Sequence, residues 1–150
     1  MGADQQVYLD DIEVGDELPS LVKTCTTRQL VMWAAASGDF YEIHYDLGFA
    51  AANRLDGLLV HGALKHAFLG QLLHDWVAPG GRITSFGCSY RGTDGPGEPL
   101  TCRGVVTAVD PGRREVAVDV WIEKADGTVT TKGPATVELP LRSGTAAGVP

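Results

Sequence analysis

The chain has 150 residues, of which 44% are hydrophobic and 21% charged, as in an ordinary soluble globular domain. Its net charge of -7 argues against nucleic acid or an anionic membrane as the main partner, because both need a basic surface. The three cysteines form no C-x-x-C pair, which predicts reduced thiols and no zinc site. The sequence also offers no apolar run of membrane-spanning length and no signal-peptide pattern, so we expect a cytoplasmic protein.

The composition along the chain predicts one domain over residues 7–140, between a flexible N-terminus at 1–6 and a flexible tail at 141–150. The tail is rich in Ser, Gly and Ala. Residues 7–19 have scattered apolar positions, and we expect irregular chain with a short strand there. A strand is predicted over 21–25.

Two helices are predicted by their end signals. Thr26 with Gln29 three positions later forms a capping box, and Gly38 is a typical helix stop. Asp46 is placed to cap a second, short helix over 47–53.

A longer helix is predicted over residues 61–77, ended by the Pro-Gly-Gly at 79–81. One stripe of this helix is formed by Leu64, Ala67, Phe68, Leu72 and Asp75, and beside it lie Leu69, Leu73 and Trp76. A helix that is apolar over so much of its circumference is usually central and buried.

The second half reads as strands at 82–92, 100–110, 115–124 and 128–139. The Ala-Asp-Gly at 125–127 suits a tight hairpin between the last two. A buried helix followed by antiparallel strands predicts an α+β fold, with the sheet wrapped on the helix.

Residues 37–46 read S-G-D-F-Y-E-I-H-Y-D and interleave acidic and aromatic side chains. Alone, Asp39 fits a turn and His44 fits a core or loop histidine. A segment of this kind can also place a carboxylate and an imidazole in one apolar pocket. The H-G pair at 61–62 then supplies what such a pair needs, a helix start with an open glycine N–H.

Together the two motifs resemble the MaoC-like dehydratases, the (R)-specific enoyl-CoA hydratases with the hotdog fold. The family motif is roughly G-D-x-N-P-x-H-x-D, followed by H-G before the central helix. The resemblance covers about residues 7–139. It implies a long central helix wrapped by a curved antiparallel sheet, with a short helical overhang around the catalytic loop.

The resemblance implies that Asp39 and His44 are catalytic and that the Gly62 N–H binds the thioester carbonyl oxygen. In this chemistry His44 takes the proton of water and Asp39 handles the second proton. Glycine suits position 62 because the substrate carbonyl must come close to the backbone there.

Further candidates for substrate contact are His61, Tyr41 and Glu42. We expect His61 mainly to form hydrogen bonds within the structure, whereas Glu42 is either solvated or lies in the substrate channel. Tyr41 and Glu42 replace the N-P of the family motif, and residues 93–98 replace an apolar-Pro pair. Both departures fall where the acyl pocket should be, and they are compatible with a bulky acyl group.

The expected reaction is addition of water to a trans-2-enoyl-CoA, or to the same acyl group on an acyl carrier protein, giving an (R)-3-hydroxyacyl thioester. We expect no cofactor and no metal. The expected assembly is a homodimer or a heteromer with a second hotdog subunit.

Two other functions remain open at this point. The first is an acyl-binding subunit of a heteromeric hydratase for a bulky or steroid-like acyl chain, although such a subunit need not keep either Asp39 or His44. The second is a hotdog thioesterase, which usually needs a carboxylate on or near the central helix. The helix start at residues 61–68 supplies none.

Overall fold

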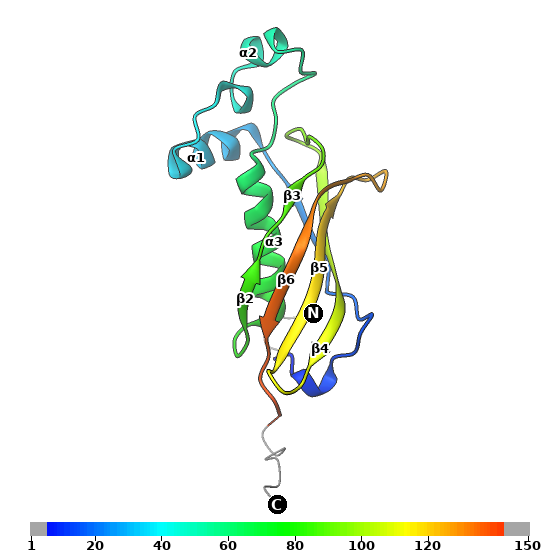
Figure 1. Ribbon diagram of the computed structural model, residues 1–150. Helices are drawn as coiled ribbons and strands as arrows, with labels where there is room; N and C mark the ends of the chain where they lie inside the picture. Colours follow the sequence, from blue (N-terminus) through cyan, green and yellow to red (C-terminus); the bar gives the residue numbers. More distant parts are fainter. Residues whose placement is uncertain (1–5, 143–150) are drawn as a thin grey trace, which may run out of the picture.

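A computed structural model of the chain describes residues 6–142 (Figure 1). The flexibility predicted for 1–5 and 143–150 therefore lies outside the described residues. At the two ends of the described part, the Gln6 side chain accepts a hydrogen bond from the Gly80 amide, and Arg142 pairs with Asp11.

The helices follow the local signals closely. They are η1 (Leu9–Asp11), α1 (Thr27–Ser37), η2 (Glu42–His44), α2 (Leu47–Ala52) and α3 (Gly62–Val77). The Thr26 hydroxyl accepts from the Gln29 amide, Gly38 ends α1 at φ 77°, and Asp46 accepts from the Phe49 amide, so the predicted caps are confirmed. The prediction of a short strand within 7–19 is wrong, because this segment forms η1 and contributes only one isolated bridge, from Glu17.

The strands form one antiparallel sheet in the order β1-β4-β5-β6-β2, with β3 also paired to β6. They are β1 (Leu21–Thr24), β2 (Arg82–Phe86), β3 (Ser89–Tyr90), β4 (Pro99–Asp110), β5 (Glu115–Glu123) and β6 (Val129–Glu138). The predicted strand at 82–92 is thus divided in two. At the break the two backbones approach closely, because a Cβ on Gly133 of β6 would overlap the Gly87 carbonyl oxygen, and the adjacent Pro134 has no N–H to donate.

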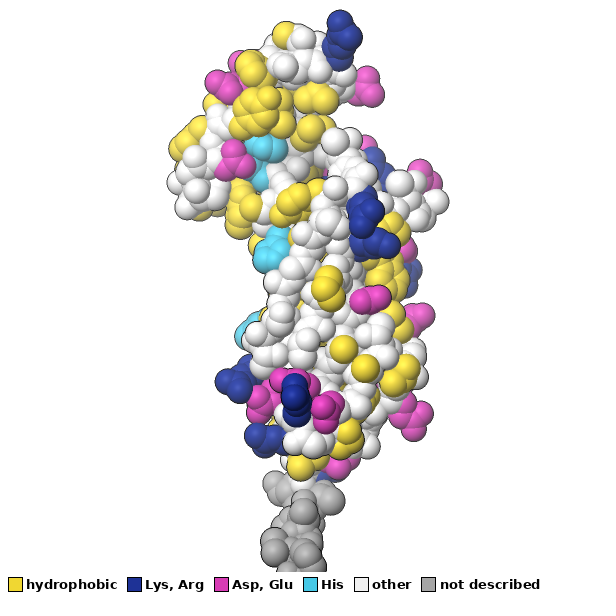
Figure 2. Space-filling model, in the orientation of Figure 1, with side chains coloured by type: hydrophobic (Ala, Val, Ile, Leu, Met, Phe, Trp, Pro, Cys, Tyr) yellow, Lys and Arg dark blue, Asp and Glu magenta, His cyan; other side chains and the backbone are white. Residues whose placement is uncertain are grey.

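Basic and acidic side chains are interspersed over the face shown in Figure 2 and form no single basic patch there.

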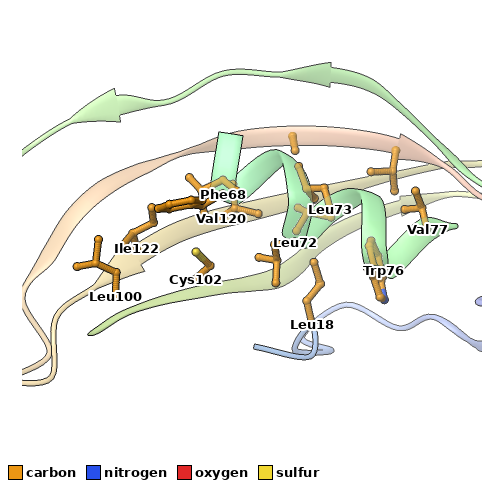
Figure 3. Packing of buried hydrophobic residues seen from close by; sticks show 14 of the residues in the cluster. Leu18, Phe68, Leu72, Leu73, Trp76, Val77, Leu100, Cys102, Val120 and Ile122 are labelled. Atoms are coloured by element: carbon orange, nitrogen blue, oxygen red, sulfur yellow. The ribbon is translucent and has the colours of Figure 1, made fainter. Parts of the chain in front are cut away.

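The core lies between α3 and the sheet (Figure 3). Phe68, Leu72 and Leu73 of α3 face buried residues of β4 and β5, among them Val120 and Ile122. The predicted buried helix and the α+β hotdog architecture are therefore confirmed. Within the helix the predicted stripe is partly wrong. Ala67 and Asp75 are exposed, whereas Lys65 is buried.

All three cysteines are free, which confirms the prediction of unpaired thiols. Cys25 and Cys102 are fully buried, and burial raises the pKa of Cys102 to about 12. Cys102 therefore stays a neutral thiol at physiological pH. Within residues 6–142, none of the helices combines the length and the apolar character that crossing a membrane requires.

The overhang formed by α1, η2 and α2 stands beyond the N-terminal end of α3 (Figure 1). Its attachment is partly through the backbone, because the Leu59 amide donates to the Ile43 carbonyl at 3.1 Å. This placement brings residues 37–46 next to the start of the central helix.

Candidate active site

His44 is held in one orientation by the backbone. It ends the 3₁₀ turn η2, is only 7% exposed, and its Nδ1 lies 2.8 Å from the Leu59 carbonyl oxygen. A carbonyl oxygen only accepts, so Nδ1 carries the proton and donates it. The remaining nitrogen, Nε2, is left as a proton acceptor on the side of Asp39.

Asp39 reaches the same point from the solvent side. It follows the left-handed residue Gly38, and its Oδ2 lies 3.9 Å from Nε2 of His44, with the Asp39 side chain 47% exposed. This distance is longer than a direct hydrogen bond. A carboxylate and an imidazole at this spacing can flank one small reacting molecule, such as water.

His61 lies behind the pair and is fully buried. Its ring stacks on that of His44 with centroids 3.7 Å apart, and its Nε2 lies 3.3 Å from the Asp39 carbonyl oxygen. Burial, and secondarily the neighbouring His44, lowers the pKa of His61, so the ring is neutral at neutral pH. His61 therefore contacts both members of the pair without reaching solvent.

The lowered pKa of His61 predicts acid sensitivity. The unfolded chain takes up a proton near pH 6.5, while the folded chain resists it, so stability is full above that pH and falls as pH decreases through it. We expect His61→Gln to flatten this dependence, which has a limiting slope of about 1.4 kcal/mol per pH unit. Urea unfolding at a series of pH values between about 5 and 8 measures this slope of the free energy of unfolding against pH. The exposed His74→Gln is the control, and an unchanged slope in His61→Gln would contradict the prediction.

Asp39, His44 and His61 also have potential metal-ligand atoms within 4.8 Å of one another. The stacked rings, only 20° apart in plane, direct their nitrogen lone pairs side by side rather than toward one point. His61 Nε2 is moreover engaged with the Asp39 carbonyl. The arrangement suits proton transfer better than the converging geometry of a metal centre.

Gly62 is the first residue of α3, directly after His61 at the N-cap, whose side chain forms no cap. The first amides of a helix have no intrahelical acceptor, and the helix dipole makes this end attractive to negative charge. The glycine N–H can therefore receive an oxygen that becomes negative during a reaction.

Tyr41 and Glu42 lie at the rim of this site. Tyr41 is 50% exposed, and its ring meets that of His44 edge to face at 6.3 Å. Glu42 is exposed at the start of η2 and forms no ion pair with any described residue. Phe40 and Leu47 add exposed apolar surface. In Figure 2, histidines in the upper part of the molecule are bordered by hydrophobic side chains.

Sequence reasoning missed two residues near Gly62. Ring atoms of Tyr90 lie 3.0 Å from where a Cβ on Gly62 would be, so Tyr90 packs directly against the glycine. Lys65, one turn further along α3, is buried. The one sequence signal was a lysine inside an otherwise apolar helix stripe.

Comparison with known proteins gives a consistent family assignment. The family model described as "MaoC like domain" matches residues 13–127. A curated relative, the (R)-specific enoyl-CoA hydratase of Aeromonas caviae, is 28% identical over 130 residues, which cover 86% of this chain and 96% of the relative.

Solved structures agree. The structure described as the (R)-hydratase from A. caviae involved in PHA biosynthesis superposes with a TM-score of 0.81 at 27% identity, covering 87% of this chain and 98% of that one. A chain of the ChsH1-ChsH2 complex from Mycobacterium tuberculosis gives a TM-score of 0.76 at 24% identity, covering 85% and 98%. The second likeness shows the shared fold alone.

Proposed function

The chain belongs to the MaoC-like domain family, and we propose that it catalyses the reversible hydration of a trans-2-enoyl thioester to an (R)-3-hydroxyacyl thioester. The observation that carries this proposal is the approach of Asp39 to Nε2 of His44 beside the open start of α3. The similarity to an (R)-specific enoyl-CoA hydratase supports it.

The side chains suggest how the two protons move. His44 Nε2 accepts a proton from water as the water oxygen bonds to the β carbon, because its Nδ1–H is engaged by the Leu59 carbonyl. The proton then passes from the His44 imidazolium to the Asp39 carboxylate, which delivers it to the α carbon, so that both groups end in their starting states. The Gly62 N–H stabilises the negative charge that grows on the thioester oxygen meanwhile. Tyr41 and Glu42 border the entrance, and His61 supports His44.

We also propose that the enzyme acts as a dimer, either of two identical chains or with a second hotdog subunit. The edge formed by β2 and β3 is paired only to β6 among the described strands, so a partner sheet can extend it. The matched complex of two different proteins shows that this fold occurs in heteromers. Light scattering of the purified protein distinguishes a homodimer from a lone chain that awaits a partner.

The proposed reaction is tested with crotonyl-CoA and with longer and branched enoyl-CoAs. Loss of the enone absorbance, with the (R)-3-hydroxyacyl product identified on a chiral column, is the expected result. Release of free thiol instead would mean thioester hydrolysis. No change with any substrate, also after addition of a second hotdog subunit encoded nearby, would favour an acyl-binding role. Both latter outcomes would overturn the proposal.

A groove on the outer face of the sheet predicts a preference for CoA over shorter carriers. It measures ≈ 680 Å³, and its lining includes Arg91, Lys132 and Trp121. Asp119 also lines the groove, but neither cation forms an ion pair with it, so both can meet phosphate, while the indole offers a stacking surface. Arg91, at one end of this lining, directly follows in the chain Tyr90, the residue that contacts Gly62.

We therefore expect Arg91→Gln with Lys132→Gln to raise KM for crotonyl-CoA about tenfold, the equivalent of one lost charge-assisted contact. KM for crotonyl-pantetheine, which lacks the nucleotide, should stay the same. Steady-state kinetics on the two substrates measure the difference. Arg113→Gln, an exposed arginine at the far turn, is the control. An equal rise for both substrates would contradict the assignment of the groove.

A further inference from the structure

A buried ion pair lies one helical turn from Gly62. Lys65 Nζ is 2.7 Å from Asp94 Oδ2, with side chains 3% and 0% exposed. Lys65 comes from α3 and Asp94 from the loop between β3 and β4. The ammonium also donates to the Gly92 carbonyl at 3.0 Å. The reaction proposed above uses neither charge.

The buried Lys65–Asp94 pair is expected to contribute little to the free energy of unfolding. Removing two charges from water costs several kcal/mol each, and an apolar pair of similar volume is often at least as stable. Here the second oxygen of Asp94 has no hydrogen-bond partner among the described residues, so the desolvation is incompletely compensated. A positional role explains the pair better than a contribution to stability does.

The contacts of the pair converge on Gly62. The Asp94 carbonyl accepts from the Val60 amide at 2.8 Å, which ties the loop to the segment that leads into α3. Lys65 Nζ lies 5.7 Å from the centre of the Tyr90 ring, within cation–π range. The same ring rests on Gly62. The lysine is therefore linked to both sides of the glycine.

On the premise of the proposed hydration, we propose that the Lys65–Asp94 pair positions the Gly62 amide for the thioester carbonyl, acting through Tyr90 and Val60. Neither residue touches the reacting atoms. A displacement of about 1 Å at an oxyanion donor can cost on the order of 10² in rate. Loss of the pair should therefore lower kcat and leave KM nearly unchanged.

The test uses glycine-selective ¹⁵N labelling of the whole protein. The Gly62 amide signal is assigned by its disappearance in Gly62→Ala, and Tyr90→Leu shows how far it moves when the ring is removed. In the double variant Lys65→Met, Asp94→Leu we expect the Gly62 signal to shift in the direction seen in Tyr90→Leu. The urea midpoint should stay near that of the parent. The signals of Gly112 and Gly127, in distant turns, should not move.

With crotonyl-CoA the double variant should lose about tenfold to hundredfold in kcat, with KM within about threefold. Asp94→Asn keeps an acceptor for Lys65, so the shift of the Gly62 signal and the loss of kcat should be in the same direction but smaller. This variant provides the test if the double variant does not fold. An unshifted Gly62 signal, or an unchanged kcat with a shifted one, would overturn the inference. If the parent protein itself lacks hydratase activity, the proposed function fails and the catalytic role with it, while the Gly62 signal still decides whether the pair positions this amide.

Discussion

Asp39→Asn and His44→Ala are each expected to lower kcat for enoyl-CoA hydration by about 10²–10⁴-fold, the range typical of a lost general acid or base. Asp39→Asn keeps the shape of a half-exposed side chain, so the fold should be preserved. His44→Ala also removes the ring stacked on His61 and the bond to the Leu59 carbonyl, so some stability should be lost as well. Circular dichroism and thermal melts separate the two effects.

The two residues should behave as one unit. Because the reaction moves its proton through both groups, loss of either one already stops that route. The kcat of the double variant should therefore be only slightly lower than that of the less active single variant. Asp56→Asn, an exposed acid in the same overhang, is the matched control and should keep full activity. Near-parental kcat in either Asp39→Asn or His44→Ala would remove the dyad from the mechanism.

The parts of the fold that the sequence predicted well depend on short-range physics. Thr26, Gly38 and Asp46 act on amides within one turn of themselves, so their patterns are visible in the chain. The central helix was recognisable because it is apolar over much of its circumference. The MaoC-like resemblance and the hotdog fold are both confirmed by the comparisons.

The misses depend on partners distant in the chain. The break in the predicted strand at 82–92 lies opposite Gly133 and Pro134, which belong to another strand. Lys65 is buried within a helix face that the sequence predicts to be apolar. Its burial is possible because Asp94, on a loop distant in the chain, neutralises its charge. The sequence shows the lysine within the apolar helix, but its partner and the position of the strand break are visible only in the folded chain.

The same division holds within the candidate site. Asp39, His44 and Gly62 could be singled out from two short motifs, and the structure brings them to one end of α3. The stacking of His61 on His44 could not be predicted from the sequence, because it depends on how the overhang is positioned relative to the helix. The role of Gly62 can be tested at its backbone N–H alone, because this amide is the group proposed to bind the thioester oxygen.

Gly62→Pro is expected to lower kcat by about 10²–10³-fold relative to Gly62→Ala, the cost typical of one lost oxyanion donor. Proline is well tolerated at the first position of a helix, where the missing N–H has no intrahelical acceptor. His61, at φ -56° and ψ 134°, already lies outside the α region that is disfavoured for a residue before proline. The substitution therefore removes the donor while the helix start keeps its shape.

Gly62→Ala is the matched control, because it adds a Cβ and keeps the N–H. That Cβ would lie 3.0 Å from ring atoms of Tyr90, which is 53% exposed and can move outward, so a modest loss of kcat is expected from alanine alone. Kinetics with crotonyl-CoA and thermal melts of both variants measure the difference. Equal kcat values in two folded proteins would mean that the Gly62 amide does not bind the oxyanion. The charge on the thioester oxygen would then have to be met by another donor, such as the Ala63 amide in the same helix turn.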